Sequence, residues 1–388
     1  MNDQVKDMGA NAVHEEFAPP KQTLLSGTAT QSQLIWAAFK AHRLAMISLF
    51  VLLLLYFIAA FAEFLAPHDP HQVNARYTYA PPQTIRLFDL EDGFKFRPHA
   101  LGYKVEVDQV ALRRTFVVDE TQKFDIHFFV KSHEAKMWGL FKIDRHLFGV
   151  DGRREVMFLL GTDRLGRDLF SRLIYGARIT LSIGLVGIML SLVLGVLIGG
   201  ISGYYRGIAD NVIQRVIEFL RSIPAIPLWM GLAAALPRDW SPLQNYFAIT
   251  ILLSLIGWTE LARVVRSRFL STIGEDYVSA ARLDGVSDFR IIMRHMLPAF
   301  TSHIIATATL AIPGMILAET ALSFLGLGLQ SPVISWGVLL QEAQNLRALV
   351  DAPWLMWPGA LIIVTILAMN FLGDGLRDAA DPYGSTHD

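Results

Sequence analysis

Side chains able to do chemistry are sparse in this chain, and one group of them lies between residues 160 and 178. Asp163, Arg167 and Asp168 follow one another closely there, with Gly166 in the turn between them. A carboxylate next to a guanidinium forms a charge-assisted pair, whereas a carboxylate free to exchange its proton could act as a general acid or base. Because the spacing favours local pairing around a tight turn, we expect a structural clamp here and not a catalytic site.

Three further acidic residues lie in or next to apolar segments, where an ionisable group is a functional candidate by default. Glu319 could line a transport pathway or brace neighbouring helices through a hydrogen bond. Glu260 is expected to pair at the inner membrane surface with the arginines three and six positions later. Asp374 is expected to pair with Arg377 at the end of the last apolar segment.

Motifs for enzymatic chemistry are absent from the sequence. There is no cysteine, no phosphate-binding G-x-x-x-x-G-K-[ST] loop, no HExxH and no GxSxG. His295 and His303 are about two helical turns apart across a proline, which indicates packing more than metal ligation. We therefore expect no catalytic residues, no bound metal and no cofactor in this chain, so any uphill transport would need energy from another subunit.

The elements that carry these residues are those of a membrane protein. The 388 residues have a mean hydropathy of +0.38 and only 18% charged residues, against about 25% in soluble domains. The net charge of −1 gives no support to a nucleic-acid partner. Apolar runs of about 20 residues are long enough to cross a bilayer. They predict an all-α polytopic membrane protein with six spans, at 44–65, 179–201, 212–236, 246–265, 300–324 and 354–372.

A polar island, residues 275–298, interrupts these runs and predicts a helix–turn–helix hairpin. Residues 280–283 favour helix, and Gly285 suits a helix end that needs positive φ. Ser287 is a candidate N-cap for a second helix, and Pro298 lies where the next span would begin. A polar hairpin rooted in the membrane but facing water is suited to being bound by another protein.

The island resembles the cytoplasmic signature of membrane subunits of binding-protein-dependent ABC importers. Its form is similar to that of the oligopeptide/dipeptide (peptide/nickel/opine) permeases, which read E-x-x-x-x-A-A-R-x-x-G and R-H-x-L-P. Ser279 and His295 depart from the general signature, which has Glu and Ile at these positions. The resemblance implies an ATPase-coupling hairpin, residues 267–298, whose key residues are Glu275, Ala280, Ala281, Arg282, Gly285, Arg294, His295, Leu297 and Pro298.

Residues 160–178 resemble the same permeases through the pattern L-G-T-D-x-x-G-R-D-x-x-S-R-x-x-x-G-x-R. The stretches AETALSFLGLG and NFLGDGLRDAADP are similar to them as well. The resemblance covers about residues 35–65 and 158–384. It implies the type I ABC importer permease fold, with Asp163, Gly166, Arg167 and Asp168 at the outer mouth of the pore, and it identifies the chain as a second-type (C-type) subunit.

Residues 66–172 are expected to form an extracytoplasmic insertion between the first and second spans. Segments 104–108, 115–118 and 124–130 alternate apolar and polar residues, which predicts β-strands. The insertion could be a decoration that packs on the complex or a dock for a binding protein. We expect residues 1–32 to be a disordered cytoplasmic tail, 33–65 an interfacial helix and first span, 173–378 the permease core, and 379–388 a second tail.

Arginines set the expected orientation. Six of them lie in or just before the island, and the two short opposite loops hold only Arg238 and Arg347. By the positive-inside rule the island and both termini are cytoplasmic, in a bacterial inner membrane.

The resemblance implies a heterodimer with a second permease, two ATPase subunits that bind ATP and Mg²⁺, and an extracytoplasmic solute-binding protein. It makes peptides the expected substrate, with oligosaccharides or nickel as alternatives. A secondary transporter driven by an ion gradient, or a membrane receptor, would be function classes of a different kind.

Overall fold

The computed structural model describes residues 31–89, 95–108, 113–152, 155–237 and 239–380. Most of the tail predicted over residues 1–32 lies outside these ranges, as does the tail 379–388 beyond residue 380. At the N-terminal end the described chain starts with helix α1 (Gln31–Ala41), which precedes the first long apolar helix.

Five helical runs are long and apolar enough to cross a membrane. They confirm five of the predicted spans in place, and each is longer or shorter than predicted by a few residues or more. They are α2 (Arg43–Ala60), α4 (Leu169–Tyr205), α7 (Pro242–Thr272), the run Asp288–Phe324 that ends in α10 (Thr301–Phe324), and the run Pro353–Ala379, formed by the short η5 (Pro353–Met356) and α13 (Trp357–Ala380).

The span predicted over 212–236 is present as two helices that are long and apolar enough to cross a membrane only when taken together. It consists of α5 (Gly207–Ser222) and α6 (Ala225–Ala234), which meet at an angle of 85°. Ile223 is extended, with φ −90° and ψ 129°, because a residue before proline is pushed out of the helical region. This span contains two prolines, Pro224 and Pro227. The break is at Pro224, while Pro227 lies in the first turn of α6, where proline is tolerated.

Helix α4 begins ten residues before the predicted second span and places the boundary at 172/173 inside a helix. Its start is fixed by Asp168, whose carboxylate accepts a hydrogen bond of 2.8 Å from the Ser171 amide. Its 37 residues make it the axis of the bundle, with α7, α10 and α2 packed against it. At Gly199 the backbone of α7 is so close that a Cβ atom would lie 2.4 Å from the Ala262 carbonyl oxygen.

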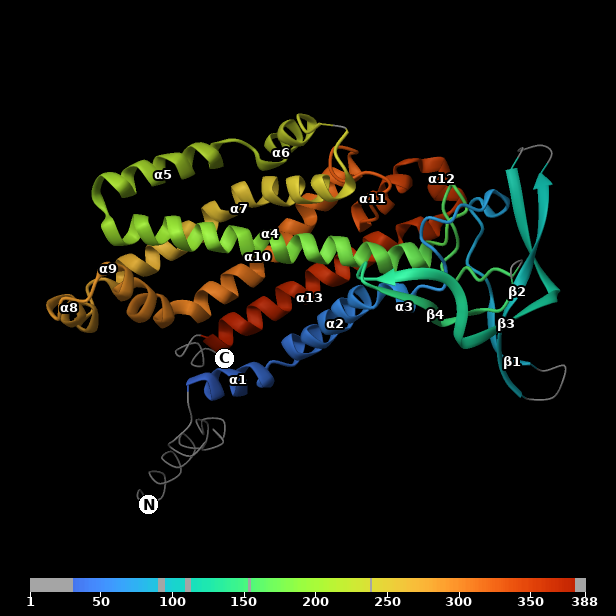
Figure 1. Cartoon of the computed structure of the whole chain (residues 1–388), viewed down its shortest axis with the longest axis horizontal. Coiled ribbons are helices and arrows are strands. Elements are labelled where there is room, and N and C mark those ends of the chain that lie inside the picture. Colours follow the sequence, from blue (N-terminus) through green and yellow to red (C-terminus); the bar gives the residue numbers. More distant parts are fainter. Residues whose placement is uncertain (1–30, 90–94, 109–112, 153–154, 238, 381–388) are drawn as a thin grey trace, which may run out of the picture.

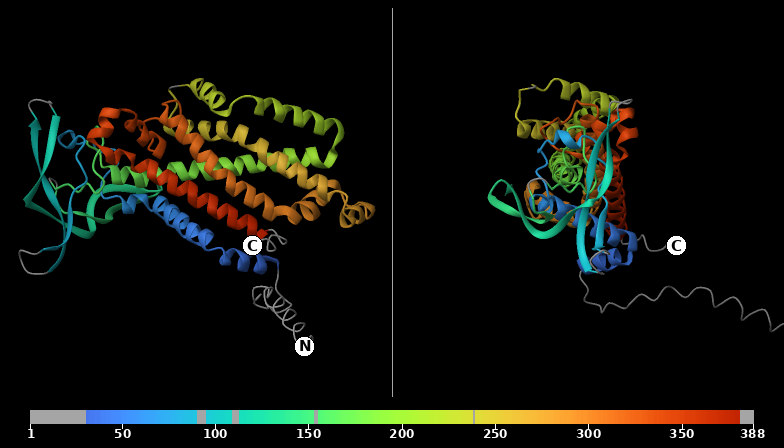
Figure 2. Two further views of the ribbon diagram at one scale, coloured as in Figure 1. Left: turned by 180° about the vertical axis from the view of Figure 1, so that it is seen from behind. Right: turned by 90° about the vertical axis from the view of Figure 1, so that its right-hand side faces the viewer.

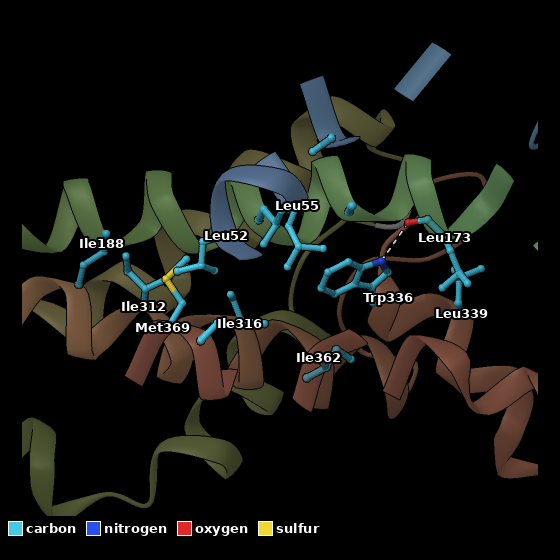
Figure 3. Close-up of a cluster of buried hydrophobic side chains, with 14 of the residues drawn as sticks. Leu52, Leu55, Leu173, Ile188, Ile312, Ile316, Trp336, Leu339, Ile362 and Met369 are labelled. Atoms are coloured by element: carbon cyan, nitrogen blue, oxygen red, sulfur yellow. Dashed lines mark hydrogen bonds between the residues drawn. The ribbon is translucent and has the colours of Figure 1, made fainter. Parts of the chain in front are cut away.

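The largest apolar core fills the space between α4, α2, α10 and α13 (Figure 3). Trp336 of the short helix α11 (Trp336–Leu340) is fully buried in it, and its indole N–H donates 3.0 Å to the Leu173 carbonyl of α4. Helix α11 is followed by a 3₁₀ turn, η4 (Gln341–Gln344), and then by α12 (Leu346–Asp351).

Residues between α3 (Ala62–Leu65) and α4 form the predicted β-rich insertion, a four-stranded antiparallel sheet in the order β1-β2-β3-β4. The strands are β1 (Ile85–Asp89), β2 (Lys95–Asp108), β3 (Arg113–Met137) and β4 (Phe141–Val150). The predicted strand 104–108 lies in β2.

The two segments predicted as separate strands, 115–118 and 124–130, belong to the single strand β3. Its first part pairs with β2 as far as Asp125, opposite His99, and its second part pairs with β4 from Ile126. The polar residues between the two segments do not reverse the chain. They are taken up by a bulge opposite Leu101 and Gly102, where the register shifts.

Figure 1 shows the sheet at one end of the long axis and the short helix α8 (Asp276–Leu283) at the other. Helix α1 and the C-terminal end of α13 lie nearer the α8 end, and the view from behind in Figure 2 agrees. The polar island and the insertion are therefore separated by the length of the helix bundle.

Candidate functional site

The first half of the predicted hairpin is α8 and its C-terminal turn. Gly285 has φ +73°, as predicted. The Val286 amide donates 3.1 Å to the Ala281 carbonyl and the Gly285 amide donates 3.1 Å to the Arg282 carbonyl, which is the hydrogen-bond pattern of a Schellman motif. This turn fixes the direction in which the chain leaves α8.

The second half differs from the prediction of a separate helix followed by a span. After α9 (Asp288–Arg290) comes a π-helical turn, η2 (Ile291–Met296), then a 3₁₀ turn, η3 (Leu297–Phe300), and then α10. Pro298 cannot donate a backbone hydrogen bond and its ring would clash with the carbonyl four residues earlier, which accounts for irregular turns at this point. The hairpin therefore runs into α10 without a loop.

Ser287 takes the predicted N-cap position only through its backbone. Its carbonyl accepts 3.0 Å from the Ile291 amide, and its side chain makes no capping hydrogen bond. Glu275 likewise occupies the N-cap position of α8 without a side-chain capping bond.

The hairpin buries one face and exposes the other. Val278, Ile291 and Met296 are fully buried in a cluster that includes Phe269 of α7, whereas Leu283 is 89% exposed. Among the other predicted residues, Ala281 is buried, His295 and Leu297 are half-buried, and Ala280, Arg282, Arg294 and Pro298 are exposed.

The base of the hairpin is tied to the end of α4 by Tyr204. The Tyr204 hydroxyl donates to the Asp288 carboxylate and accepts from the Arg282 guanidinium at 3.3 Å. The same guanidinium lies over the Tyr204 ring, 5.6 Å from its centre. Movement of the hairpin tip would therefore be transmitted to α4 as well as to α10.

At the other end of the bundle, the predicted clamp is an ion-pair cluster. Arg167 Nε lies 2.6 Å from Asp163 Oδ2, and its terminal nitrogen lies 3.0 Å from Glu342 Oε1. Arg172 Nε approaches Asp163 Oδ2 at 3.5 Å. Burial, and then the nearby Asp163 carboxylate, raise the pKa of Glu342, against the opposing pull of the two arginines.

Asp168 is not a member of this cluster, although the sequence predicted local pairing. Its carboxylate caps α4 and lies 3.7 Å from His68 Nδ1. Gly166, with φ +71°, lies so close to the Asn74 carbonyl that a Cβ atom would be 1.9 Å from that oxygen. The turn thus holds the start of the insertion against the start of α4.

Glu319 is fully buried in α10 and joins two elements. Its Oε1 atom accepts hydrogen bonds from Ser323 at 2.8 Å and from Ser335 at 2.7 Å. Ser335 in turn caps α11 by accepting 3.2 Å from the Val338 amide. This geometry is that of a brace between α10 and α11.

The ion pair predicted for Glu260 forms with another partner, and the one predicted between Asp374 and Arg377 does not form. Glu260 pairs with Arg221 of α5. The two arginines predicted for it, Arg263 and Arg266, are not its partners, and Arg266 binds Asp210 through two hydrogen bonds of 2.6 Å. Since both groups come from α5 and α7, tertiary packing decided the pairing.

Within the described part of α13, Asp374 and Arg377 are both exposed and no ion pair joins them. His303 Nδ1 accepts a hydrogen bond of 3.3 Å from the Arg268 guanidinium. In the ranges that the structure describes, no group of three or more histidine or acidic residues is placed to hold a metal ion.

The sequence did not reveal the acidic partners of two arginines in residues 160–178. Glu342 comes from η4, far along the chain from Arg167. Glu63, at the end of the first span, binds Arg178 through two hydrogen bonds of 2.6 Å. The sequence did contain a hint of that pair: Glu63 is an isolated acidic residue at the end of one apolar run, and Arg178 lies at the start of the next.

Two models of known protein families match parts of this chain. The family described as binding-protein-dependent transport system inner membrane component matches residues 195–383, and that described as the N-terminal TM domain of oligopeptide transport permease C matches residues 30–82. Neither match includes any strand of the sheet, because the match to the N-terminal TM domain ends at residue 82 and the other begins at residue 195.

Relatives with curated descriptions are similar over more than half of the chain. The oligopeptide transport system permease protein OppC of Haemophilus influenzae is 40% identical over 229 residues, which are 59% of this chain and 71% of that protein. The dipeptide transport system permease protein DppC of Bacillus subtilis is 39% identical over 224 residues, 57% of this chain and 68% of that protein.

A solved structure of the MetNI methionine ABC transporter, in an inward-facing conformation, aligns at 18% identity with a TM-score of 0.44, covering 54% of this chain and 97% of that one. The identity and coverage of the relatives above establish the family. This chain belongs to the binding-protein-dependent transport system inner membrane components and is a permease subunit of an ABC importer.

Proposed function

We propose that this permease forms half of a peptide translocation pathway in a bacterial inner membrane. It would pair with a second permease in the type I importer fold, with both termini cytoplasmic and the sheet outside. Two ATPase subunits would bind ATP and Mg²⁺, and a solute-binding protein would deliver the substrate. Peptides are the proposed cargo because the similar OppC and DppC proteins are named for peptide transport; oligosaccharides or nickel are the alternatives.

The observation that carries this proposal is the exposed apolar tip of the hairpin. Leu283 and Phe289 are 89% and 74% exposed, on either side of the Gly285 turn and at the far end of the molecule from the sheet (Figure 1). Large apolar side chains held in water on a structured element mark a protein contact site. An ATPase subunit is the proposed partner for this tip.

The mechanism follows from how the hairpin is built. Residues 288–324 run without a loop from the tip into α10, and Tyr204 links the base to α4. ATPase closure would then move α10 and α4 together as packed helices, which suits alternating access. The ion-pair cluster at Asp163, Arg167 and Glu342 is proposed to hold the outer end rigid, and Glu319 to brace it.

Site-directed cross-linking tests the contact, because the chain has no cysteine of its own. Leu283→Cys should cross-link to a co-expressed ATPase subunit carrying an engineered cysteine. Leu346→Cys, 77% exposed on α12 at the other end of the molecule, is the matched control and should not. Equal cross-linking at the two positions would contradict the proposed coupling site.

Uptake into vesicles tests the energy source and cargo together. Uptake should require internal ATP and the co-expressed ATPase and binding protein, and excess unlabelled peptide should compete where nickel or an oligosaccharide does not. Uphill transport by the purified chain alone, driven by an ion gradient, would refute the proposal in favour of a secondary transporter.

A further inference from the structure

The turn of the β3–β4 hairpin bears an apolar cluster that packing within the chain leaves uncovered. Trp138, Leu140 and Phe141 are 52%, 75% and 61% exposed. They are consecutive apart from Gly139, so all three lie at the tip of the hairpin. A soluble sheet would place polar residues at such a turn.

The backbone of this turn also departs from what the residue types favour. Trp138 and Gly139 have φ +52° and +75°, and the Leu140 amide donates 3.0 Å to the Met137 carbonyl. Positive φ at both central positions defines a type I′ turn, whose first position usually holds Asn, Asp or Gly. A tryptophan there is held against a local preference, which points to a use for the indole.

Two contacts fix the turn at a known level along the first span. Trp138 Nε1 donates 2.8 Å to the Ala60 carbonyl, and the Trp138 amide donates 3.2 Å to Glu63, which is buried and forms an ion pair with the half-buried Arg178. Ala60 is the last residue of α2, whose 18 residues span about 27 Å, close to the thickness of the hydrocarbon core. The indole therefore lies level with one end of a helix that is long enough to cross the hydrocarbon.

The tip is continuous with the surface that α2 turns outward. Phe57 contacts Phe61, with ring centres 4.7 Å apart, and Phe61 contacts Trp138 at 6.2 Å. Phe57 is 53% exposed, as befits a side chain of a membrane-spanning helix. Figure 2 shows the β3–β4 hairpin splayed away from β1 and β2, beside the helices.

The strands behind the tip carry a like-charge pair. Lys136 and Lys142 are exposed and face each other directly across the ladder, an arrangement that is unfavourable in isolation. Lipid phosphates at the membrane surface would neutralise both ammonium groups, which are long enough to reach the headgroups.

From these placements we propose that the β3–β4 hairpin is a membrane anchor: Trp138, Leu140 and Phe141 enter the outer interface of the bilayer, and Lys136 and Lys142 bind lipid headgroups. The combination of an aromatic at headgroup depth, apolar side chains and flanking lysines is that of an interfacial segment. The anchor would fix the sheet against the bilayer beside α2. This proposal requires that α2 crosses the membrane, and it is independent of which substrate is transported.

Spin labels on single cysteines test this in the assembled transporter, reconstituted in nanodiscs of phosphatidylethanolamine and phosphatidylglycerol. A label on Leu140→Cys should collide with oxygen severalfold more often, relative to a neutral water-soluble nickel chelate, than a label on Thr121→Cys. Thr121 is the matched control, exposed in the polar bulge of the same strand.

Two results would overturn the proposal. Collision with the nickel chelate equal to that at Thr121→Cys would place the tip in water. A label shielded from both oxygen and nickel would place it against a protein partner such as the second permease.

A variant with Lys136→Gln and Lys142→Gln, labelled at Leu140→Cys, tests the headgroup contact. Its label should be shallower than in the parent in phosphatidylglycerol nanodiscs and unchanged in nanodiscs of phosphatidylcholine alone. An identical depth in phosphatidylglycerol would refute the role of the lysines.

Discussion

Gly285 shapes the proposed coupling hairpin through its backbone conformation and not through contacts with neighbouring atoms. Its φ is +73°, yet a Cβ atom added there would meet nothing within 4 Å. Any side chain therefore fits sterically. The cost of a substitution is the energy of holding a non-glycine residue in the left-handed conformation, about 1–2 kcal/mol for an ordinary residue and more for a β-branched one.

Gly285→Val should therefore reduce ATP-dependent uptake while leaving membrane insertion intact, because the turn that aims the tip would be distorted. Gly274→Val is the matched control, since that position is equally open and its φ is not in the left-handed region. Uptake and expression level measured in the same vesicles check the prediction. Normal uptake by Gly285→Val would argue against the hairpin as the lever.

Glu319 is the acceptor for two buried serine hydroxyls, from Ser323 and Ser335. Glu319→Ala should lower the free energy of unfolding by about 1–3 kcal/mol, because it leaves both hydroxyls without their partner. Thermal unfolding in detergent measures this. Glu319→Gln keeps an acceptor oxygen and should lose less; an equal loss in the two variants would contradict the bracing role.

At the scale of elements, the β3–β4 pair contains a histidine stack. The rings of His133 and His146 lie 4.2 Å apart and nearly parallel. Burial, and then the neighbouring His146, lower the pKa of His133 to about 4, while Asp69 acts in the opposite direction and His68 in the same one. Above the ordinary histidine pKa of about 6.5 the neutral stack contributes fully to stability.

Acidification should therefore loosen these strands. Between about pH 6.5 and 4 the unfolded state binds more protons than the folded state, so the free energy of unfolding decreases as the pH is lowered through that window. Hydrogen exchange of β3 and β4 amides, corrected for intrinsic rates, should be faster at pH 5 than at pH 7.5. His133→Phe should remove that dependence and His127→Phe, in the same strand, should retain it. An unchanged dependence in His133→Phe would show that other groups titrate.

The helices α4 and α7 and the strand β3 show where the sequence patterns agree with the structure and where they differ from it. The length of the apolar runs located α4 and α7 but not their ends, and the polar stretch 119–123 was interpreted as a break between strands. A bulge accommodates it, so β3 continues. Local polarity cannot distinguish a turn from a bulge, because the difference depends on what the partner strand does.

On the scale of the whole molecule, the segments that enter and leave the sheet lie side by side. The Gln83 amide donates 2.9 Å to the Phe158 carbonyl, and the Phe158 amide donates 2.6 Å to the Gln83 side chain. The chain thus leaves and re-enters the permease core at one place. Residues 83–194, which include the sheet and most of α4, lie outside both family matches.

Replacing residues 84–155 by a short Gly-Ser linker should leave binding of the ATPase subunit unchanged, because the coupling hairpin lies at the opposite end. Copurification from membranes measures the ratio of the two subunits. Replacing hairpin residues 275–287 by the same linker should abolish copurification. Loss of the ATPase in the first variant would mean that the sheet has more than an outer role.

The sequence by itself determined the family, the membrane class, the five continuous spans, the β-rich character of the insertion and the positive φ of Gly285. Each depends on local chemistry, on run length or on residue type, which are written along the chain. Tertiary structure alone decided the partners: Glu342 for Arg167, Glu63 for Arg178, Arg221 for Glu260, and the single course of β3. Charged groups pair with whichever opposite charge the fold brings within reach, and that distance is set by packing between segments far apart in sequence.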